Sequence, residues 1–298
     1  MIIYLQNNQQ IAGNDLLAAI LRVDLVPIPV TLELTLNASD MLKEQVVVGN
    51  KLLTANGIEL QIVKVETMTS QVVKDGKRIG AMAVIAVLAG CESLINTTKK
   101  AVSHDGASFS EIYRSLGAKV KFGNDIKVNS FVCLKGQIPT KRIALALQKE
   151  ACVLVYDIPT KTLNVRRIQE LLESKTASVY DPSAVQWIAN NQAIARQNTH
   201  YLSLDDNGSD VLGQVSDNKS IDYMPRCDNR ELHNLKRILV TCGVIIRALD
   251  DKLVAGNVIS VSGKNLVILT SAIRIDTGSM GGQSVMASKA WLAKMVET

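Results

Sequence analysis

The sequence predicts an α+β fold that is mainly β, in which two similar antiparallel β-barrel domains are separated by an α+β insert. The first observation is a strand with strict alternation, Val30 to Leu36, whose apolar and polar residues take turns. The second is a turn-rich strand pair, Val46 to Thr67, whose pattern returns near the C-terminus at Leu253 to Ile275. The third is a change to helical patterns between the two segments.

The two similar segments share their turn dipeptides and the apolar residues that follow. Gly49-Asn50 matches Gly256-Asn257, and both residue types tolerate the positive φ angles that tight turns need. Further along, Leu60 and Ile62 match Leu266 and Ile268 once one residue is lost in between. The match predicts an internal duplication, with chance similarity between two β-rich segments as the alternative.

The first part of the chain predicts mostly strands. A helix is expected from Asn14 or Asp15, because Asn14 can cap it and apolar residues follow at helical spacing. A slip in the apolar phase after Ile62 indicates a β-bulge or a bend. A further strand is predicted from Arg78 to Leu88, and close turns between strands favour an antiparallel barrel or sandwich.

The middle of the chain carries helix signals. Ser108 and Glu111 form a capping box before a short helix that ends at Gly117. Further helices are expected at Lys141 to Ala151, from Asn164, and from Ser183 toward Gln197. Strands are expected at Lys119 to Phe122, Asp125 to Leu134 and Val153 to Tyr156.

The C-terminal part returns to strand patterns. Residues 205 to 220 are polar and predict a surface loop, and Gln283 to Val296 predicts a helix carrying Trp291. The predicted division is residues 1–100 for the first barrel, 101–200 for the insert, 201–277 for the second barrel and 278–298 for a C-terminal tail or helix.

Composition limits the possible functions. Of 298 residues, 47% are apolar and 20% charged, which is typical of a folded protein. The net charge of +5 is mild and aromatic residues make up only 4%, so the stacking surface of a single-stranded nucleic-acid binder is not expected. The N-terminus lacks signal-peptide features, and the longest apolar run, Ala81 to Cys91, is too short to span a bilayer. We expect synthesis and folding in the cytoplasm and no membrane contact.

No catalytic, cofactor or metal site is predicted. The sequence contains no nucleophile elbow, zinc-protease motif or P-loop, and Gly278 to Gly282 lacks the lysine of a phosphate loop. Five cysteines without metal-ligand spacing predict buried, reduced thiols. The remaining candidates are lone histidines (His104, His200, His233), acidic residues that miss the calcium-loop pattern (Asp205, Asp206, Asp210, Asp217), and ion pairs of Arg166 and Arg167 with Glu170 and Glu173. The chain is therefore not expected to be an enzyme.

Four segments carry a resemblance to a known family. They are Val26 to Asp40, Phe109 to Val120, Gly136 to Asp157 and Leu253 to Asp276, together with the Gly-Asn hairpin. Their arrangement resembles the tail hub (baseplate hub) proteins of tailed phages and related contractile injection systems. It is also similar to the N-terminal part of type VI secretion spike proteins.

The resemblance implies a structural role in a virion. Hubs of this family form a homotrimeric ring whose two tube-like barrels per chain give pseudo-sixfold symmetry. The ring joins the sixfold tail tube to the threefold central spike. The expected partners are further copies of the chain, the tail tube protein, the central spike protein, the tape measure protein and other baseplate proteins. Assembly would take place in the host cytoplasm, and DNA would at most pass through a lumen.

Two other functions remain open at this point. One is a tail-associated cell-wall hydrolase, which peptidoglycan lysis by the isolated chain would reveal. The other is a barrel protein that binds single-stranded nucleic acid, for which salt-dependent binding is the test.

Overall fold

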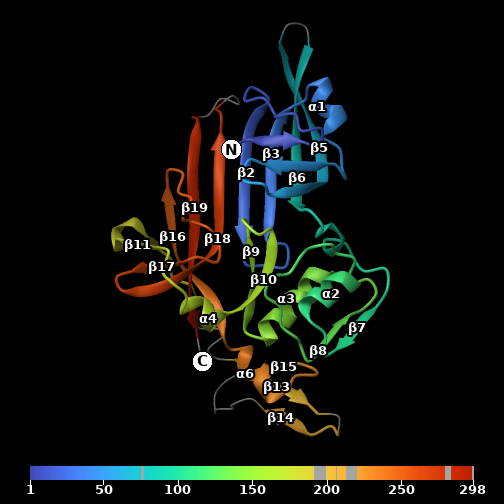
Figure 1. Ribbon diagram of the computed structural model, residues 1–298, viewed down its shortest axis with the longest axis vertical. Helices are drawn as coiled ribbons and strands as arrows, with labels where there is room; N and C mark the ends of the chain where they lie inside the picture. Colours follow the sequence, from blue (N-terminus) through green and yellow to red (C-terminus); the bar gives the residue numbers. More distant parts are fainter. Residues whose placement is uncertain (75–76, 191–198, 206, 213–219, 279–282, 297–298) are drawn as a thin grey trace.

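A long sheet runs through the whole molecule. The computed structural model describes residues 1–74, 77–190, 199–205, 207–212, 220–278 and 283–296. Twelve strands form one sheet whose main path runs β1-β4-β5-β6-β3-β2-β18-β19-β16-β12, and β17 joins β11 to β18 (Figure 1). The prediction of a mainly β, α+β fold with antiparallel sheets is confirmed.

The N-terminal half of the sheet is here called the first unit. In β3, the four alternate apolar residues are at most 3% exposed and Glu33 is exposed, as the alternation predicts. The predicted hairpin is present, but its first strand begins at Lys51, because Asp40–Gln45 forms a helix and Val46 caps its end. The elements are β1 (Ile3–Leu5), β2 (Leu16–Asp24), β3 (Val30–Asn37), α1 (Asp40–Gln45), β4 (Lys51–Thr54), β5 (Glu59–Lys74) and β6 (Lys77–Leu88).

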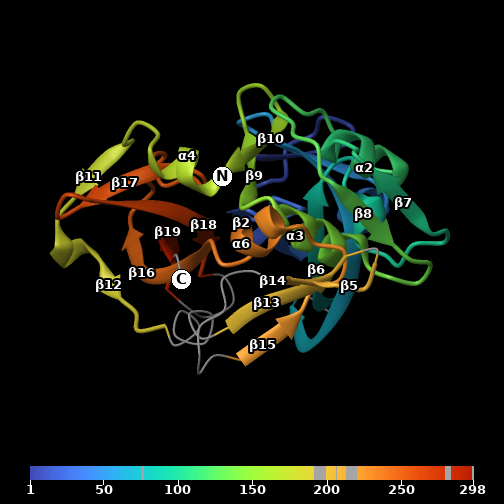
Figure 2. The ribbon, with the colours of Figure 1, turned by 90° about the horizontal axis from the view of Figure 1, so that it is seen from below.

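The C-terminal half of the sheet, the second unit, is directly hydrogen-bonded to the first. The two units are distant in sequence, yet β18 pairs with β2 over Thr270–Asp276 and Ala18–Asp24 (Figure 2). The described strands of this sheet pair antiparallel except β11 with β17. The elements are β11 (Ser178–Tyr180), β12 (Gln186–Trp187), β16 (Ile238–Arg247), β17 (Val258–Val261), β18 (Lys264–Asp276) and β19 (Val285–Val296).

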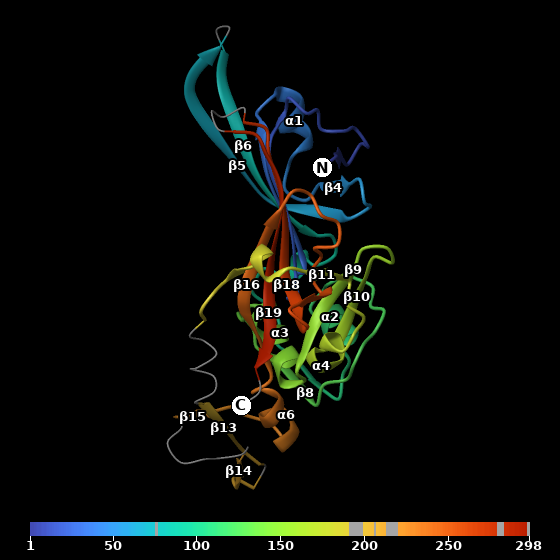
Figure 3. The same cartoon turned by 90° about the vertical axis from the view of Figure 1, so that its left-hand side faces the viewer.

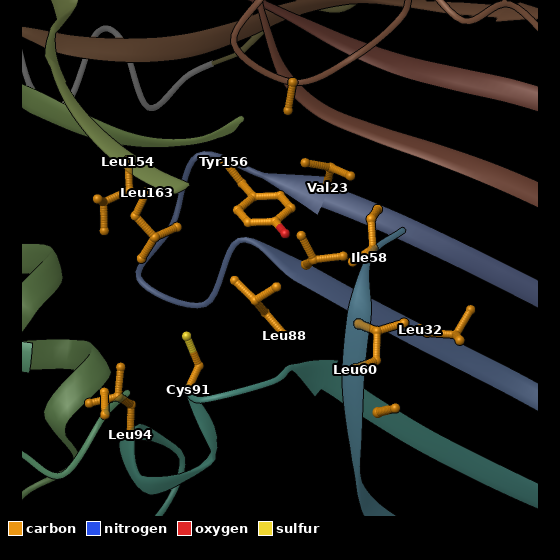
Figure 4. Packing of buried hydrophobic residues seen from close by; sticks show 14 of the residues in the cluster. Val23, Leu32, Ile58, Leu60, Leu88, Cys91, Leu94, Leu154, Tyr156 and Leu163 are labelled. Carbon is orange, nitrogen blue, oxygen red and sulfur yellow. The ribbon is translucent and has the colours of Figure 1, made fainter. Parts of the chain in front are cut away.

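The α+β insert covers one face of the first unit and shares its core. Tyr156 of β9 points toward Val23, Ile58 and Leu88 of the first unit (Figure 4). Tyr113 of α2 is buried, and its hydroxyl donates to the Pro27 carbonyl at 2.8 Å. The elements are a 3-10 helix (Glu92–Leu94), β7 (Val102–Asp105), α2 (Phe109–Ser115), β8 (Ser130–Cys133), α3 (Pro139–Lys149), β9 (Cys152–Asp157), β10 (Thr162–Arg167), α4 (Ile168–Leu172) and a 3-10 helix (Pro182–Ala184).

A small module follows the insert and lies at the end of the molecule opposite the β5–β6 hairpin (Figure 3). Its core is the cluster of Tyr201, Cys227, Leu232 and Leu235. The elements are β13 (Thr199–Leu204), β14 (Asp210–Leu212), β15 (Ser220–Tyr223) and α6 (Asn229–Asn234).

Polar contacts attach this module to the end of α3. Arg230 of α6 makes a bidentate ion pair with Glu150, whose side chain is only 2% exposed. Asn234 donates to the Lys149 carbonyl at 2.9 Å, and the Lys149 ammonium donates to the Arg226 carbonyl at 3.2 Å. The carboxylate of Glu150 raises the pKa of the Arg230 guanidinium. A buried carboxylate thus depends on one arginine for its compensation.

Two predicted helices are strands. The residues after Asn14 form β2, where a bulge between Leu16 and Ala18 disturbs the alternation that would have marked a strand. The C-terminal segment, predicted as a tail or helix, forms β19, a central strand between β18 and β16. Its buried positions hold small residues such as Ser288 and Ala290, which hides the alternation.

Three more predictions need correction, and two are confirmed. The capping box of Ser108 and Glu111 is present, and α3 confirms the helix expected at Lys141 to Ala151. Residues 162–167 form β10, so the helix expected from Asn164 begins at Ile168. The helix expected from Ser183 is a 3-10 turn followed by β12, and residues 191–198 lie outside the described residues. Within Lys119 to Leu134 the regular strand is β8.

The division into domains at residues 100, 200 and 277 stays a prediction. The insert and the first unit share one hydrophobic cluster, which also takes in Ala255, Val258 and Val267 of the second unit. The second unit has a further cluster around Tyr180, Ile245 and Leu292.

The first testable prediction concerns the two matching glycines, Gly49 and Gly256. Both have positive φ, +99° and +92°, so an alanine at either position costs about 1–2 kcal/mol. A Cβ at Gly256 would lie 2.7 Å from Cγ1 of Val155 in β9, whereas nothing lies within 4 Å at Gly49. We therefore expect Gly256→Ala to lower the free energy of unfolding by about 1–3 kcal/mol more than Gly49→Ala. Urea denaturation of both variants measures this, and equal losses would contradict the packing described.

The second prediction concerns the polar attachment of the small module. Arg230→Ala leaves the buried Glu150 carboxylate unpaired, which weakens the attachment by about 2 kcal/mol. Limited proteolysis with mass spectrometry should then show faster cleavage within residues 199–235. The control is Arg274→Ala, which removes an exposed ion pair with Asp276 and should leave the attachment of the module unchanged. Equal cleavage rates in the two variants would show that the pair does not hold the module.

Candidate assembly surface

The Gly-Asn turn of the first unit has a distinct set of hydrogen bonds. The Gly49 amide donates to the Ile62 carbonyl at 2.9 Å, and the Ile62 amide donates to the Asn50 carbonyl at 2.9 Å. The side-chain amide of Asn50 donates to the carbonyl of Gln45, at 2.8 Å. Glycine is required because φ is positive.

The Gly-Asn turn of the second unit has the same set. The Gly256 amide donates to the Ile268 carbonyl at 2.9 Å, and the Ile268 amide donates to the Asn257 carbonyl at 2.9 Å. The side-chain amide of Asn257 donates to the carbonyl of Lys252, five residues earlier, at 3.0 Å. The repeated sequence therefore marks a repeated structure.

The repeat extends to the strand order. The register shifts after Ile62 in the β5–β6 pair and after Ile268 in the β18–β19 pair, so the predicted bulge is present twice. In each unit the strands are arranged in the same way. The corresponding strands are β2 and β12, β3 and β16, β4 and β17, β5 and β18, and β6 and β19.

The junction between the units is a ladder between β2 and β18 with a buried polar contact. Asp24 is 6% exposed, and its carboxylate accepts a 2.5 Å hydrogen bond from the Thr270 hydroxyl. Arg22 Nε lies 2.7 Å from the same carboxylate. Because a one-residue slip would send Asp24 and Thr270 to opposite faces, this contact fixes the register of the junction.

The sheet face opposite the insert carries charged, small and apolar side chains in alternation. One row across five strands has register partners in the order Lys64, Ile85, Glu33, Ile20 and Arg274. Positive and negative groups are mixed along the row. This row therefore has neither the apolar band of a lipid contact nor the basic stripe of a nucleic-acid contact.

Two strands of this sheet, β5 and β12, have open edges within the described residues. On its outer side, β5 pairs with β4 through Gln61, and within the described residues no strand pairs with that side beyond Val63. At one end of the sheet, β12 pairs with β16 alone among the strands that the structure describes. Open edges are templates for pairing with another chain.

The chemical candidates from the sequence do not meet. In the described part of the chain, no three His, Cys, Asp or Glu residues are grouped so that they could hold a metal ion. His104 lies on β7, His200 on β13 and His233 on α6, which are separate elements. Burial raises the pKa of the Cys91 and Cys152 thiols to about 12, so both stay protonated at neutral pH.

Among the acidic candidates, Asp205 has structural partners and Asp210 begins β14. Asp205 accepts bonds from the Asn207 and Ser209 amides, as in a turn, whereas Asp206 and Asp217 lie outside the described residues. The predicted Arg167–Glu170 pair is present at 3.9 Å. Glu173 accepts from Gln169 instead, and residues 279–282 of the glycine-rich segment are likewise outside the description.

One wide depression of the insert is lined by a single carboxylate, that of Asp125. It measures about 690 Å³ and is lined by Arg114, Lys119, Lys121 and Asp125 among others. Asp125 accepts from the Phe109 amide at 3.0 Å and the Ser110 amide at 3.1 Å, so it caps α2. Glycosidases need two carboxylates across the scissile bond, so the lining of this depression does not favour a glycosidase site there. No helix in the described residues is long and apolar enough to cross a membrane.

Comparison with solved structures decides the fold. No protein-family model and no curated protein matches the sequence. A tail protein from Neisseria meningitidis MC58 has a TM-score of 0.61 at 9% identity, covering 98% of this chain and 95% of that one. The 43 kDa tail protein of prophage MuSo2 from Shewanella oneidensis has a TM-score of 0.60 at 9% identity, with 98% and 96% covered. The chain has the fold of phage tail proteins.

The same fold occurs in part of a larger protein. A chain of the Francisella PdpA-VgrG complex has a TM-score of 0.53 at 8% identity, covering 98% of this chain and 52% of that one. The predicted resemblance to tail hubs and type VI spike proteins is thus confirmed at the level of fold. The open strand edges of this tail fold were not predicted from the sequence. The repeated Gly-Asn turns indicate the two similar units to which these edges belong, but they do not indicate the edges themselves.

The third prediction concerns the junction of the tail fold. Asp24→Ala removes the acceptor of Thr270 and the partner of Arg22, which should destabilise the β2–β18 ladder by about 2 kcal/mol. Hydrogen exchange of residues 18–24 and 270–276 should then accelerate. The control is Asp276→Ala, at the other end of the ladder, whose side chain accepts from the exposed Arg274 and from the Gly278 amide, neither of which belongs to β2. Unchanged protection in Asp24→Ala would mean that the contact does not hold the units together.

Proposed function

We propose that the chain is a structural hub of a phage tail or related contractile injection machine. Three copies form a ring with pseudo-sixfold symmetry that joins the sixfold tail tube to the threefold central spike. The observation that carries this is the duplicated β unit with its in-chain junction between β2 and β18. One chain thereby supplies two similar building blocks that already meet edge to edge.

Symmetry matching follows from the duplication. Two similar units in each of three chains give six similar units around one axis, while the chain itself repeats three times. A heterologous contact that closes on itself leaves no strand edge open. If the ring closes, neighbouring copies would cover the open strand edges of β5 and β12.

The mixed face of the sheet suits the inside of such a ring. Alternating charges such as Arg274, Glu33 and Lys64 keep it wet and give neither DNA nor protein a continuous surface to adhere to. DNA would pass without being held. Partners in this role are the tail tube protein, the central spike protein, the tape measure protein and other baseplate proteins, with the virion tail as the location and assembly in the host cytoplasm.

The similar solved structures support this role. Two of them are tail proteins, and the third is a chain of the PdpA-VgrG complex, of which the shared fold covers 52%. We infer a structural protein and not an enzyme, whose two similar β units are built from β2–β6 and from β12 and β16–β19, with the insert between them in the sequence.

The fourth prediction is the oligomeric state. Native mass spectrometry of the full chain at micromolar concentration should show a trimer, and negative-stain images with tail tube protein should show rings. A matched measurement on Asp24→Ala should show less trimer, because the two units no longer hold a fixed angle. A chain that remains monomeric under these conditions would overturn the proposed function.

A further inference from the structure

Resting on the proposed function, we infer how neighbouring copies pair. The outer edge of β12 in one copy forms an antiparallel ladder with β5 of the next, in the register that β2 and β18 use within the chain. Trp187 of one copy then lies opposite Thr67 of the other.

The first step places the two units in common register. The bulges follow Ile62 and Ile268, which pair with Ala86 of β6 and Leu292 of β19. Ala86 and Leu292 are therefore equivalent positions.

The second step moves outward to the first strand of each unit. Ala86 pairs with Leu32, which pairs with Leu21 of β2. Leu292 pairs with Gly243, which pairs with Trp187 of β12. Leu21 and Trp187 are therefore equivalent.

The third step reads the partner from the in-chain junction. Leu21 lies opposite Ile273 of β18, and Ile273 pairs with Ser288 of β19. The position equivalent to Ser288 is Met82 of β6, and Met82 pairs with Thr67 of β5. A second copy thus brings Trp187 opposite Thr67, as Leu21 is opposite Ile273.

The exposure of Trp187 agrees with a missing neighbour. Leu21 is 5% exposed because β18 covers it, whereas Trp187 is 54% exposed. The indole lies beside Gly243: a Cβ at that position would be 3.5 Å from Trp187 Cε3, an ordinary contact distance, and would clash with Val185 Cγ1 at 2.7 Å. A large aromatic ring is thus positioned at an open edge, where a second strand would bury it.

The receiving edge on β5 is suited to a selective partner. In the described residues this side of β5 is open beyond Val63, and Met68 is 44% exposed. Lys64 and Glu66 form a 2.7 Å ion pair on the same stretch, and charges on an edge discourage unspecific pairing. In the proposed register Gln186 lies opposite Met68 and Ile188 opposite Glu66.

Disulfide trapping tests the register. Trp187→Cys combined with Thr67→Cys, in a Cys242→Ala background, should give covalent dimers and trimers on oxidation, because opposed Cβ atoms lie within roughly 5.5 Å. The matched control combines Trp187→Cys with Glu66→Cys, whose side chain points to the other face of β5. We expect about tenfold more covalent trimer from the first pair than from the control.

A second pair guards against loss of the indole. Gln186→Cys with Met68→Cys should cross-link, and Gln186→Cys with Thr67→Cys should not. Suppose that the unmodified chain is a trimer. If a control pair then cross-links to the same extent as its matched pair, or if neither proposed pair cross-links, the register is wrong while the proposed function stands. A chain that forms no trimer at all overturns both.

Discussion

The ladder between β2 and β18 is the constraint on which the rest of the structure depends. It converts two units at opposite ends of the sequence into one sheet, and it aligns their faces through the buried contact of Asp24 with Thr270. Without it, the charged and small side chains of the two halves would not lie on a common face. The ladder also fixes how the open edge of β5 is oriented relative to the open edge of β12.

The insert reinforces that constraint from the other face of the sheet. Its hairpin of β9 and β10 reaches both units, since Val155 packs against Gly256 of the second unit. At the end of the same hairpin Lys161 lies beside Gly57 and 4.0 Å from Glu59 of the first. The hairpin therefore contacts one turn in each repeat. The segment between the two repeats thus contacts both of them and helps to fix their relative orientation.

Local signals made part of this fold predictable. The strand β3 was recognisable because one of its faces is buried and the other is open, and α2 because Ser108 and Glu111 cap it within four residues. The strands β2 and β19 were missed for physical reasons. A bulge breaks the alternation of β2, and small residues occupy buried positions in β19, so neither shows a clear period. The open edges depend on pairings between residues far apart, such as Leu21 with Ile273, which no local pattern encodes.

The two long hairpins of the repeat differ in reach, and this has a geometric consequence. β5 continues to Lys74, whereas β18 ends at Asp276, which corresponds to Ser70 of β5. Both hairpins point toward the same end of the molecule (Figure 1). In a ring of three copies, long β5–β6 hairpins and short β18–β19 hairpins would therefore alternate around one end of the ring. The end of the ring that carries the hairpins would therefore have threefold symmetry, because only three of the six hairpins are long. The sheets below the hairpins would stay close to sixfold, so one ring would present the two symmetries at different levels along its axis.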